Sequence, residues 1–75
     1  MKELLEFIAK SLVDNPDAVT VNEIDGEQSI ILELKVASED VGKVIGKQGR
    51  IAKAIRTVVK AASVEQNKRV VVEII

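Results

Sequence analysis

The stretch VGKVIGKQGRIAKAIRTVVK, residues 41–60, decides how this chain folds. Apolar residues at helical spacing lie on both sides of Gly46-Lys47-Gln48-Gly49, and glycine commonly ends one helix or precedes the next. The stretch contains six basic residues and no acidic residue. It therefore predicts a short helix, a tight glycine turn and a longer helix with one basic side.

The longer helix is expected over residues 50–64. At about 100° per residue, one stripe can face a core: Ile51, Ala52, Ile55, Val58, Val59 and Ala62. Four bases lie together on another side: Arg50, Lys53, Arg56 and Lys60. Ser38 is suited to cap the short helix, and Glu39 and Asp40 suit the positive end of its dipole.

Outward from this stretch, the pattern indicates four more elements. They are a helix over residues 2–13, strands over 18–24 and 29–37, and a last strand over 69–75. The first helix is followed by a turn with Pro16, which cannot continue the helical hydrogen bonds. Asp25-Gly26 marks a hairpin turn between the first two strands. The order α-β-β-α-α-β predicts an α+β fold and a single domain over residues 1–75. Its three-stranded mixed sheet should have the helices packed on one face.

Charge is divided unevenly along the chain, although the net charge is only −1. Residues 1–40 contain three bases and ten acids, a net charge of −7, whereas residues 41–75 contain eight bases and two acids, a net charge of +6. This division favours one face for a polyanion. The alternative is a solvated helix surface.

Composition excludes several classes of function. The chain has no Cys and no His, which argues against disulfides, thiolate or imidazole metal sites and Ser-His or Cys-His catalysis. Phe7 is the only aromatic residue, so base stacking on exposed aromatic rings is not expected. We expect no enzyme activity, no catalytic residue, no metal and no cofactor. No signal peptide or membrane span is visible, and the cytoplasm is the expected compartment.

The glycine turn has the chemistry of a phosphate site. Backbone N–H groups at a helix start have no partner within the helix and favour an anion. Two glycines let a phosphodiester approach the backbone closely. Four bases surround this point: Lys43, Lys47, Arg50 and Lys53. Such a site would hold a sugar–phosphate backbone without reading a base. The alternative is an ordinary helix–helix turn.

Residues 44–50, VIGKQGR, followed by residues 52–56, AKAIR, resemble the central signature of the KH domain. The order of elements resembles the bacterial, type II arrangement, and the resemblance covers the whole chain. A lone KH domain of this size is similar to the small bacterial RNA-binding family called KhpA. The resemblance implies single-stranded RNA binding and an RNA-chaperone role in post-transcriptional regulation. It also implies a larger partner, KhpB-like, with Jag and KH domains, and a link to cell elongation and envelope synthesis.

The same resemblance assigns the nucleic-acid-binding residues. They are Lys43, Val44, Ile45, Gly46, Lys47, Gln48, Gly49, Arg50 and Lys53. The glycine loop corresponds to the clamp for about four nucleotides, and Ile45 could equally belong to the core. The chain departs from the family pattern in a short, acidic loop at residues 25–28 and in Ala52, where many KH domains have a larger aliphatic residue.

The sequence is also consistent with two other functions. They are a KH-fold protein-interaction adaptor and a single-stranded DNA binder. Surplus apolar residues also predict association as a homodimer or as a heterodimer with the larger partner: Val58, Val64, Val71 and Ile75. The competing interpretation is that the first helix covers this surface within one monomer. Gly42 in the short helix costs about 1 kcal/mol relative to Ala, for close packing or for close approach of a ligand.

Overall fold

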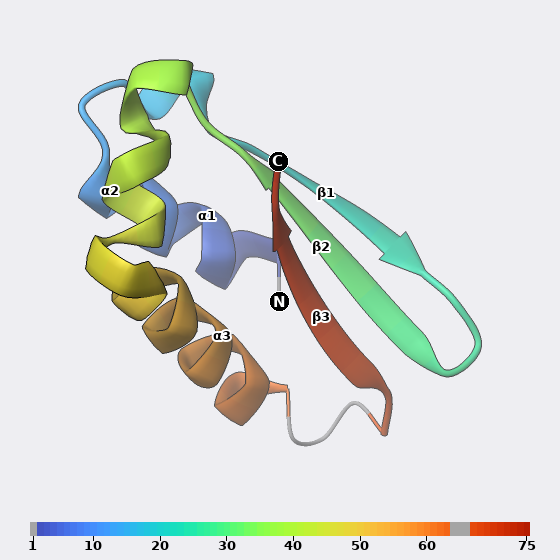
Figure 1. The fold of residues 1–75 in the computed structure, drawn as a ribbon. Coiled ribbons are helices and arrows are strands. Elements are labelled where there is room, and N and C mark those ends of the chain that lie inside the picture. The colour runs from blue at the N-terminus through green and yellow to red at the C-terminus, as the bar shows by residue number, and fades with distance from the viewer. Residues whose placement is uncertain (1, 64–66) are drawn as a thin grey trace.

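The computed structural model describes residues 2–63 and 67–75, in which helices cover one face of a three-stranded sheet (Figure 1). The helices are α1 (Lys2–Leu12), α2 (Val41–Ile45) and α3 (Arg50–Ala62). The strands are β1 (Thr20–Asp25), β2 (Ser29–Lys35) and β3 (Arg69–Ile74). The predicted element order and the α+β class are confirmed.

The sheet is mixed, with strand order β1-β2-β3. β1 pairs antiparallel with β2 through the predicted hairpin, where the Gly26 N–H donates to the Ser29 carbonyl at 2.8 Å. β2 pairs parallel with β3, because the two helices between them return the chain to the same end of the sheet. β2 is therefore central and β1 and β3 are edge strands.

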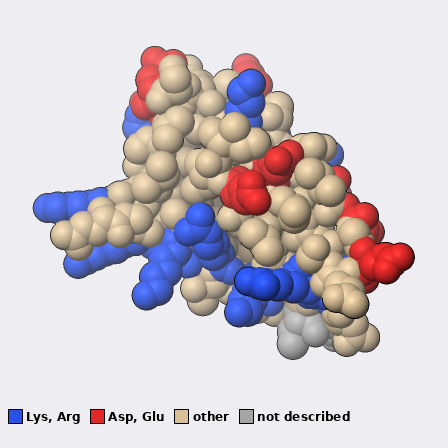
Figure 2. Space-filling model, turned by 45° about the vertical axis from the view of Figure 1, so that its right-hand side comes forward, with Lys and Arg blue, Asp and Glu red and all other residues tan. Residues whose placement is uncertain are grey.

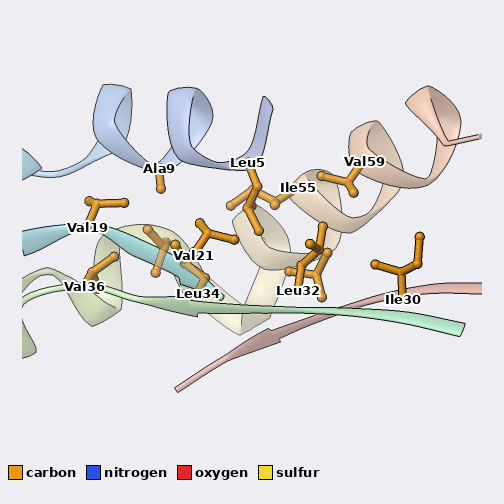
Figure 3. Packing of buried hydrophobic residues seen from close by; sticks show 12 residues of the cluster. Leu5, Ala9, Val19, Val21, Ile30, Leu32, Leu34, Val36, Ile55 and Val59 are labelled. Atoms are coloured by element: carbon orange, nitrogen blue, oxygen red, sulfur yellow. The ribbon is translucent and has the colours of Figure 1, made fainter. Parts of the chain in front are cut away.

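One face of the sheet forms the floor of the core (Figure 3). Alternation along β2 buries Ile30, Leu32 and Leu34, and Leu32 lies opposite Val72 of β3. From above, the helices contribute buried side chains: Leu5 and Ala9 from α1, Val44 from α2, and Ile55 and Val59 from α3. A fully buried Leu, Ile or Val contributes about 1.5–3 kcal/mol, so this face holds the fold together.

Several element bounds differ from the sequence prediction by one or two residues. Pro16–Ala18 forms a 3-10 turn, because Pro16 is well placed at its first position, and β1 therefore begins only at Thr20. Ser38 does not cap α2. It lies inside a second 3-10 turn, Ser38–Asp40, and its side chain makes no capping hydrogen bond.

α3 ends at Ala62, where the Ser63 hydroxyl donates to the Lys60 carbonyl at 2.8 Å. Val64, predicted as the last helical residue, lies outside the described residues. Within residues 2–63 and 67–75, no helix has the length and apolar character needed to cross a membrane.

A polar clasp joins the hairpin turn to the start of β3. The Lys68 ammonium pairs with the Asp25 carboxylate, and the Arg69 N–H donates to the Gln28 carbonyl at 3.0 Å. This clasp holds the beginning of the parallel β2–β3 pair in register.

Candidate nucleic-acid interface

The loop between α2 and α3 is a tight turn built on positive backbone angles. φ is +77° at Gly46, +59° at Gln48 and +75° at Gly49. The Gly46 N–H donates to the Gly42 carbonyl at 2.8 Å, and the Gly49 N–H donates to the Gly46 carbonyl at 3.1 Å. A residue with a side chain rarely adopts such angles, which is why two of the three positions are glycine.

The two glycines serve different purposes. A Cβ atom at Gly46 would lie 2.5 Å from Cγ1 of Ile51, so Gly46 lets the first turn of α3 pack directly on the loop. A Cβ atom at Gly49 would meet nothing within 4 Å. Gly49 therefore leaves open space at the N-terminus of α3, where backbone N–H groups favour an anion.

The polar side chains of the loop and of the first turns of α3 lie in solvent. Lys47, Gln48, Arg50 and Lys53 are all exposed, and Arg50 Nη2 lies 3.5 Å from Gln48 Oε1. No carboxylate among the described residues pairs with Lys47, Arg50 or Lys53. Figure 2 shows most Lys and Arg gathered over the left and lower middle of the view, while Asp and Glu lie toward the centre, top and right.

The two aliphatic residues before the loop have different positions. Val44 is completely buried and belongs to the core. Ile45 keeps 36% of its surface exposed next to Gly46. Of the two, only Ile45 can offer an apolar surface to a ligand.

Lys43 is held by carboxylates, unlike the other predicted bases. Its Nζ atom lies 2.8 Å from Oδ2 of Asp14 and 3.2 Å from Oδ1 of Asp40. The hydrogen bonds that Lys43 donates to Asp14 and to Asp40 raise the pKa of the Lys43 ammonium. Its charge is therefore already partnered within the chain.

Asp40 is the buried centre of a polar cluster that the sequence did not reveal. The side chain is inaccessible to solvent. Its carboxylate accepts hydrogen bonds from the backbone N–H of Asp14 at 3.3 Å and of Asn15 at 3.0 Å, and from Asn15 Nδ2 at 2.9 Å. Burial alone raises the pKa of Asp40, but these donors and Lys43 outweigh burial, and the pKa is lowered. The cluster joins the turn after α1 to the start of α2.

A groove of about 990 Å³ lies between the second half of α3 and the start of β3. α3 contributes Arg56, Thr57, Lys60 and Ala61, and the opposite wall is residues 67–72 with Lys68 and Arg69. Arg56 Nε donates to the Val72 carbonyl at 3.3 Å across the groove. The sequence identified the bases on α3, but Lys68 and Arg69 join them only through the parallel pairing of β3.

The described residues contain no group of three or more acidic side chains placed to hold a metal ion. The loop and groove thus offer backbone N–H groups, bases and apolar strand residues. This combination can bind a flexible polyanion along α3.

Comparison with known proteins identifies one matching family and several similar relatives. The family model described as KhpA/KhpB, KH domain, matches residues 2–74. The chain is 81% identical to RNA-binding protein KhpA of Clostridium acetobutylicum and 77% identical to RNA-binding protein KhpA of Clostridium perfringens, over all 75 residues and the full length of each relative.

A more distant relative, RNA-binding protein KhpA of Borreliella burgdorferi, is 58% identical over 73 residues. These residues are 97% of this chain and 89% of the relative. No solved structure matches the chain.

Proposed function

Because the chain belongs to the KhpA/KhpB KH-domain family, we propose that it is an RNA-binding protein that holds single-stranded RNA at the loop of residues 46–49. The observation that carries the proposal is the glycine turn at the start of α3. The space next to Gly49 is open. Three bases of the loop and of the first turns of α3 have no carboxylate partner among the described residues: Lys47, Arg50 and Lys53.

The geometry supports separate roles for the loop, which would bind the first phosphates, and for the groove, which would bind further nucleotides. One phosphate lies at the N-terminus of α3, within reach of Lys47 and Arg50, and Lys53 binds the next. Further nucleotides follow the α3–β3 groove between Lys60 and the apolar edge of β3. Few of these contacts read a base, so we expect weak sequence preference.

A titration of the full chain with labelled single-stranded RNA of about ten nucleotides tests this function. Competition with single-stranded DNA of the same sequence separates RNA binding from general binding of single strands. If unlabelled single-stranded DNA displaces the labelled RNA as well as unlabelled RNA does, the result would favour a DNA-binding role. No binding of either strand would favour the adaptor, in which a partner makes the nucleic-acid contacts.

We propose association through an apolar groove of about 400 Å³ between α1 and α3. Ile8 and Leu12 of α1 and Ala54 and Val58 of α3 line this groove, and Val58 keeps 48% of its surface exposed. The first helix therefore leaves nearly half of Val58 in solvent, which supports association over the monomer alternative. The occupant is a second copy or a larger, KhpB-like protein that contains Jag and KH domains.

The cellular role that fits this function is that of a non-enzymatic, single-domain RNA chaperone in the cytoplasm. Weak, sequence-tolerant contacts with single strands suit a protein that remodels many RNAs. The family resemblance extends the proposal to post-transcriptional control of cell elongation and envelope homeostasis.

A further inference from the structure

The first turn of α3 belongs to two surfaces at once. Arg50 and Ile51 directly follow the glycine loop, and both also line the apolar groove between α1 and α3. This groove is separate from the groove between α3 and β3, because the two share no lining residue. The phosphate site at the loop and the apolar groove for a partner therefore meet at these two residues.

The side chain of Arg50 extends from the apolar groove to the loop. Arg50 is the one charged residue among the described residues that line the groove. At the far end of the side chain, Nη2 lies 3.5 Å from Oε1 of Gln48 in the loop. A long basic side chain lays its methylene stem on apolar surface and keeps its charged end in water. The stem of Arg50 thus forms part of the groove, and its guanidinium lies beside the phosphate site.

The guanidinium of Arg50 is only loosely held in the free chain. Its distance of 3.5 Å from Gln48 is at the limit for a hydrogen bond, and Arg50 is exposed. A side chain of this length loses rotamer freedom when it binds a phosphate, and that loss of entropy weakens RNA binding. A partner that packs on the stem of Arg50 orders the side chain beforehand and so removes part of the loss.

Ile51 fixes the first turn of α3 relative to the loop. A Cβ atom at Gly46 would lie 2.5 Å from Cγ1 of Ile51, so this side chain rests directly on the loop backbone. The same side chain packs against the hydrophobic core and lines the groove. An Arg50 stem that is ordered in the groove is therefore also ordered relative to the phosphate site.

We propose that occupancy of the α1–α3 groove and RNA binding at the loop strengthen each other through Arg50, an inference that rests on the function proposed above for both surfaces. The occupant considered is a second copy of the chain, because the groove has its own exposed apolar rim, Leu12 and Val58, for the groove of another copy. Eight helical residues separate Val58 from Arg50 by about 12 Å. A two-fold axis near Val58 thus leaves both loops at the outer ends, free for RNA.

The coupling acts equally in both directions. If the occupied groove raises the affinity for RNA by some factor, RNA raises the affinity for the occupant by the same factor. We expect a factor of about five or more. The coupling needs no RNA that reaches both copies, and this separates it from avidity.

A tetranucleotide of RNA tests the coupling without avidity, because one loop engages about four nucleotides. The RNA is titrated into the isotope-labelled full chain, and the backbone amide signal of Gly49 in the nuclear magnetic resonance spectrum reports binding. The protein concentration is one at which light scattering shows a wild-type dimer. Val58→Asn disrupts the groove contact without adding a charge, and circular dichroism checks its fold. This variant binds the tetranucleotide about five-fold more weakly, although its loop is unchanged.

Two further backgrounds form matched controls in a double-mutant cycle. In Arg50→Gln the link is lost, so adding Val58→Asn weakens binding no further. Lys53 does not line the groove, so in Lys53→Gln the addition of Val58→Asn still weakens binding about five-fold. The coupling is overturned if wild type stays monomeric, if wild type and Val58→Asn bind equally, or if the Arg50→Gln background keeps the full effect. In each case wild-type RNA binding leaves the proposed RNA site intact, whereas a wild type that binds no RNA contradicts the proposed function as well.

Discussion

Lys43 Nζ lies 2.8 Å from Oδ2 of Asp14, a residue of the turn after α1 that is 29 positions away in sequence. This ion pair, together with buried Asp40, attaches α2 to the N-terminal part of the chain. The loop of residues 46–49 begins where α2 ends, so the cluster anchors the helix that leads into this loop. Lys43 thus differs from Lys53, which faces solvent without a carboxylate partner among the described residues.

A salt titration separates the roles of these two lysines. If three or four bases neutralise phosphates, the slope of log affinity against log salt is about −2 to −3. Lys53→Gln makes the slope shallower by about 0.7, because one phosphate contact is lost. Lys43→Gln leaves the slope unchanged and lowers the melting temperature. Equal changes in slope for both variants would show that Lys43 also contacts phosphate.

The charge of Asp40 makes the free energy of unfolding depend on pH. Its pKa is lowered by donors from Asn15, Asp14 and Lys43, so the charged form stabilises the fold. The stabilisation by the charged carboxylate is fully present above the pKa of Asp in the unfolded chain, about 3.9. It is lost as pH falls through the lower pKa of Asp40 in the folded chain. The stability difference between wild type and Asp40→Asn is therefore largest near neutral pH and narrows below about pH 4. Urea unfolding at a series of pH values measures it, and a constant difference would contradict the role of the charge.

Three glycine-to-alanine substitutions distinguish the uses of glycine around the loop. Gly46 has φ +77° and ψ 174°, a region open almost only to glycine, and its Cβ would collide with Ile51. Gly46→Ala costs about 2–4 kcal/mol of unfolding free energy and weakens RNA binding. Gly49→Ala costs about 1–2 kcal/mol, from backbone strain alone.

Gly42→Ala is the control, because a Cβ at Gly42 meets nothing within 4 Å and the residue is helical. It stabilises the chain by about 0.4–1 kcal/mol. Close packing therefore does not explain Gly42. Thermal unfolding of the three variants gives the order of stability, and a Gly46→Ala variant as stable as Gly49→Ala would contradict the packing of Ile51 on the loop.

The groove between α1 and α3 predicts the effect of a charge at Val58. Val58→Asp leaves the chain folded, because almost half of the side chain is already in solvent. Association through this groove falls by at least ten-fold, since a carboxylate would have to be buried against Ile8 and Leu12. RNA affinity falls to the value of a single site and does not vanish. Light scattering with and without the larger KH protein measures the association, and unchanged mass in both mixtures would contradict the use of this groove.

The local parts of the fold follow from the sequence. Alternating apolar residues predicted β2, whose buried Ile30, Leu32 and Leu34 lie on one face as expected. The Gly-x-x-Gly spacing predicted the turn before α3, and the hairpin turn after Asp25 also followed from its residues. These features depend on neighbours within a few positions of the chain.

The parts that sequence reasoning missed depend on contacts between distant segments. Asp40 looked like a helix-dipole residue, because its partners Asp14 and Asn15 lie 25 or 26 positions away. Lys68 and Arg69 join the bases of α3 only after β3 pairs with β2. Val71 was counted with Val58 as surplus apolar surface, but Val58 lines the groove between α1 and α3, whereas Val71 lines the groove between α3 and β3.

Lys47→Asp combined with Gln48→Asp tests whether the loop of residues 46–49 binds the phosphate backbone of RNA. Both side chains are exposed while the two glycines keep the turn, so the variant stays folded by circular dichroism. Two added carboxylates repel phosphate at the start of α3. We predict that titration with single-stranded RNA detects no binding by this variant, whereas wild type binds. Wild-type affinity in the folded double variant would contradict phosphate binding at this loop.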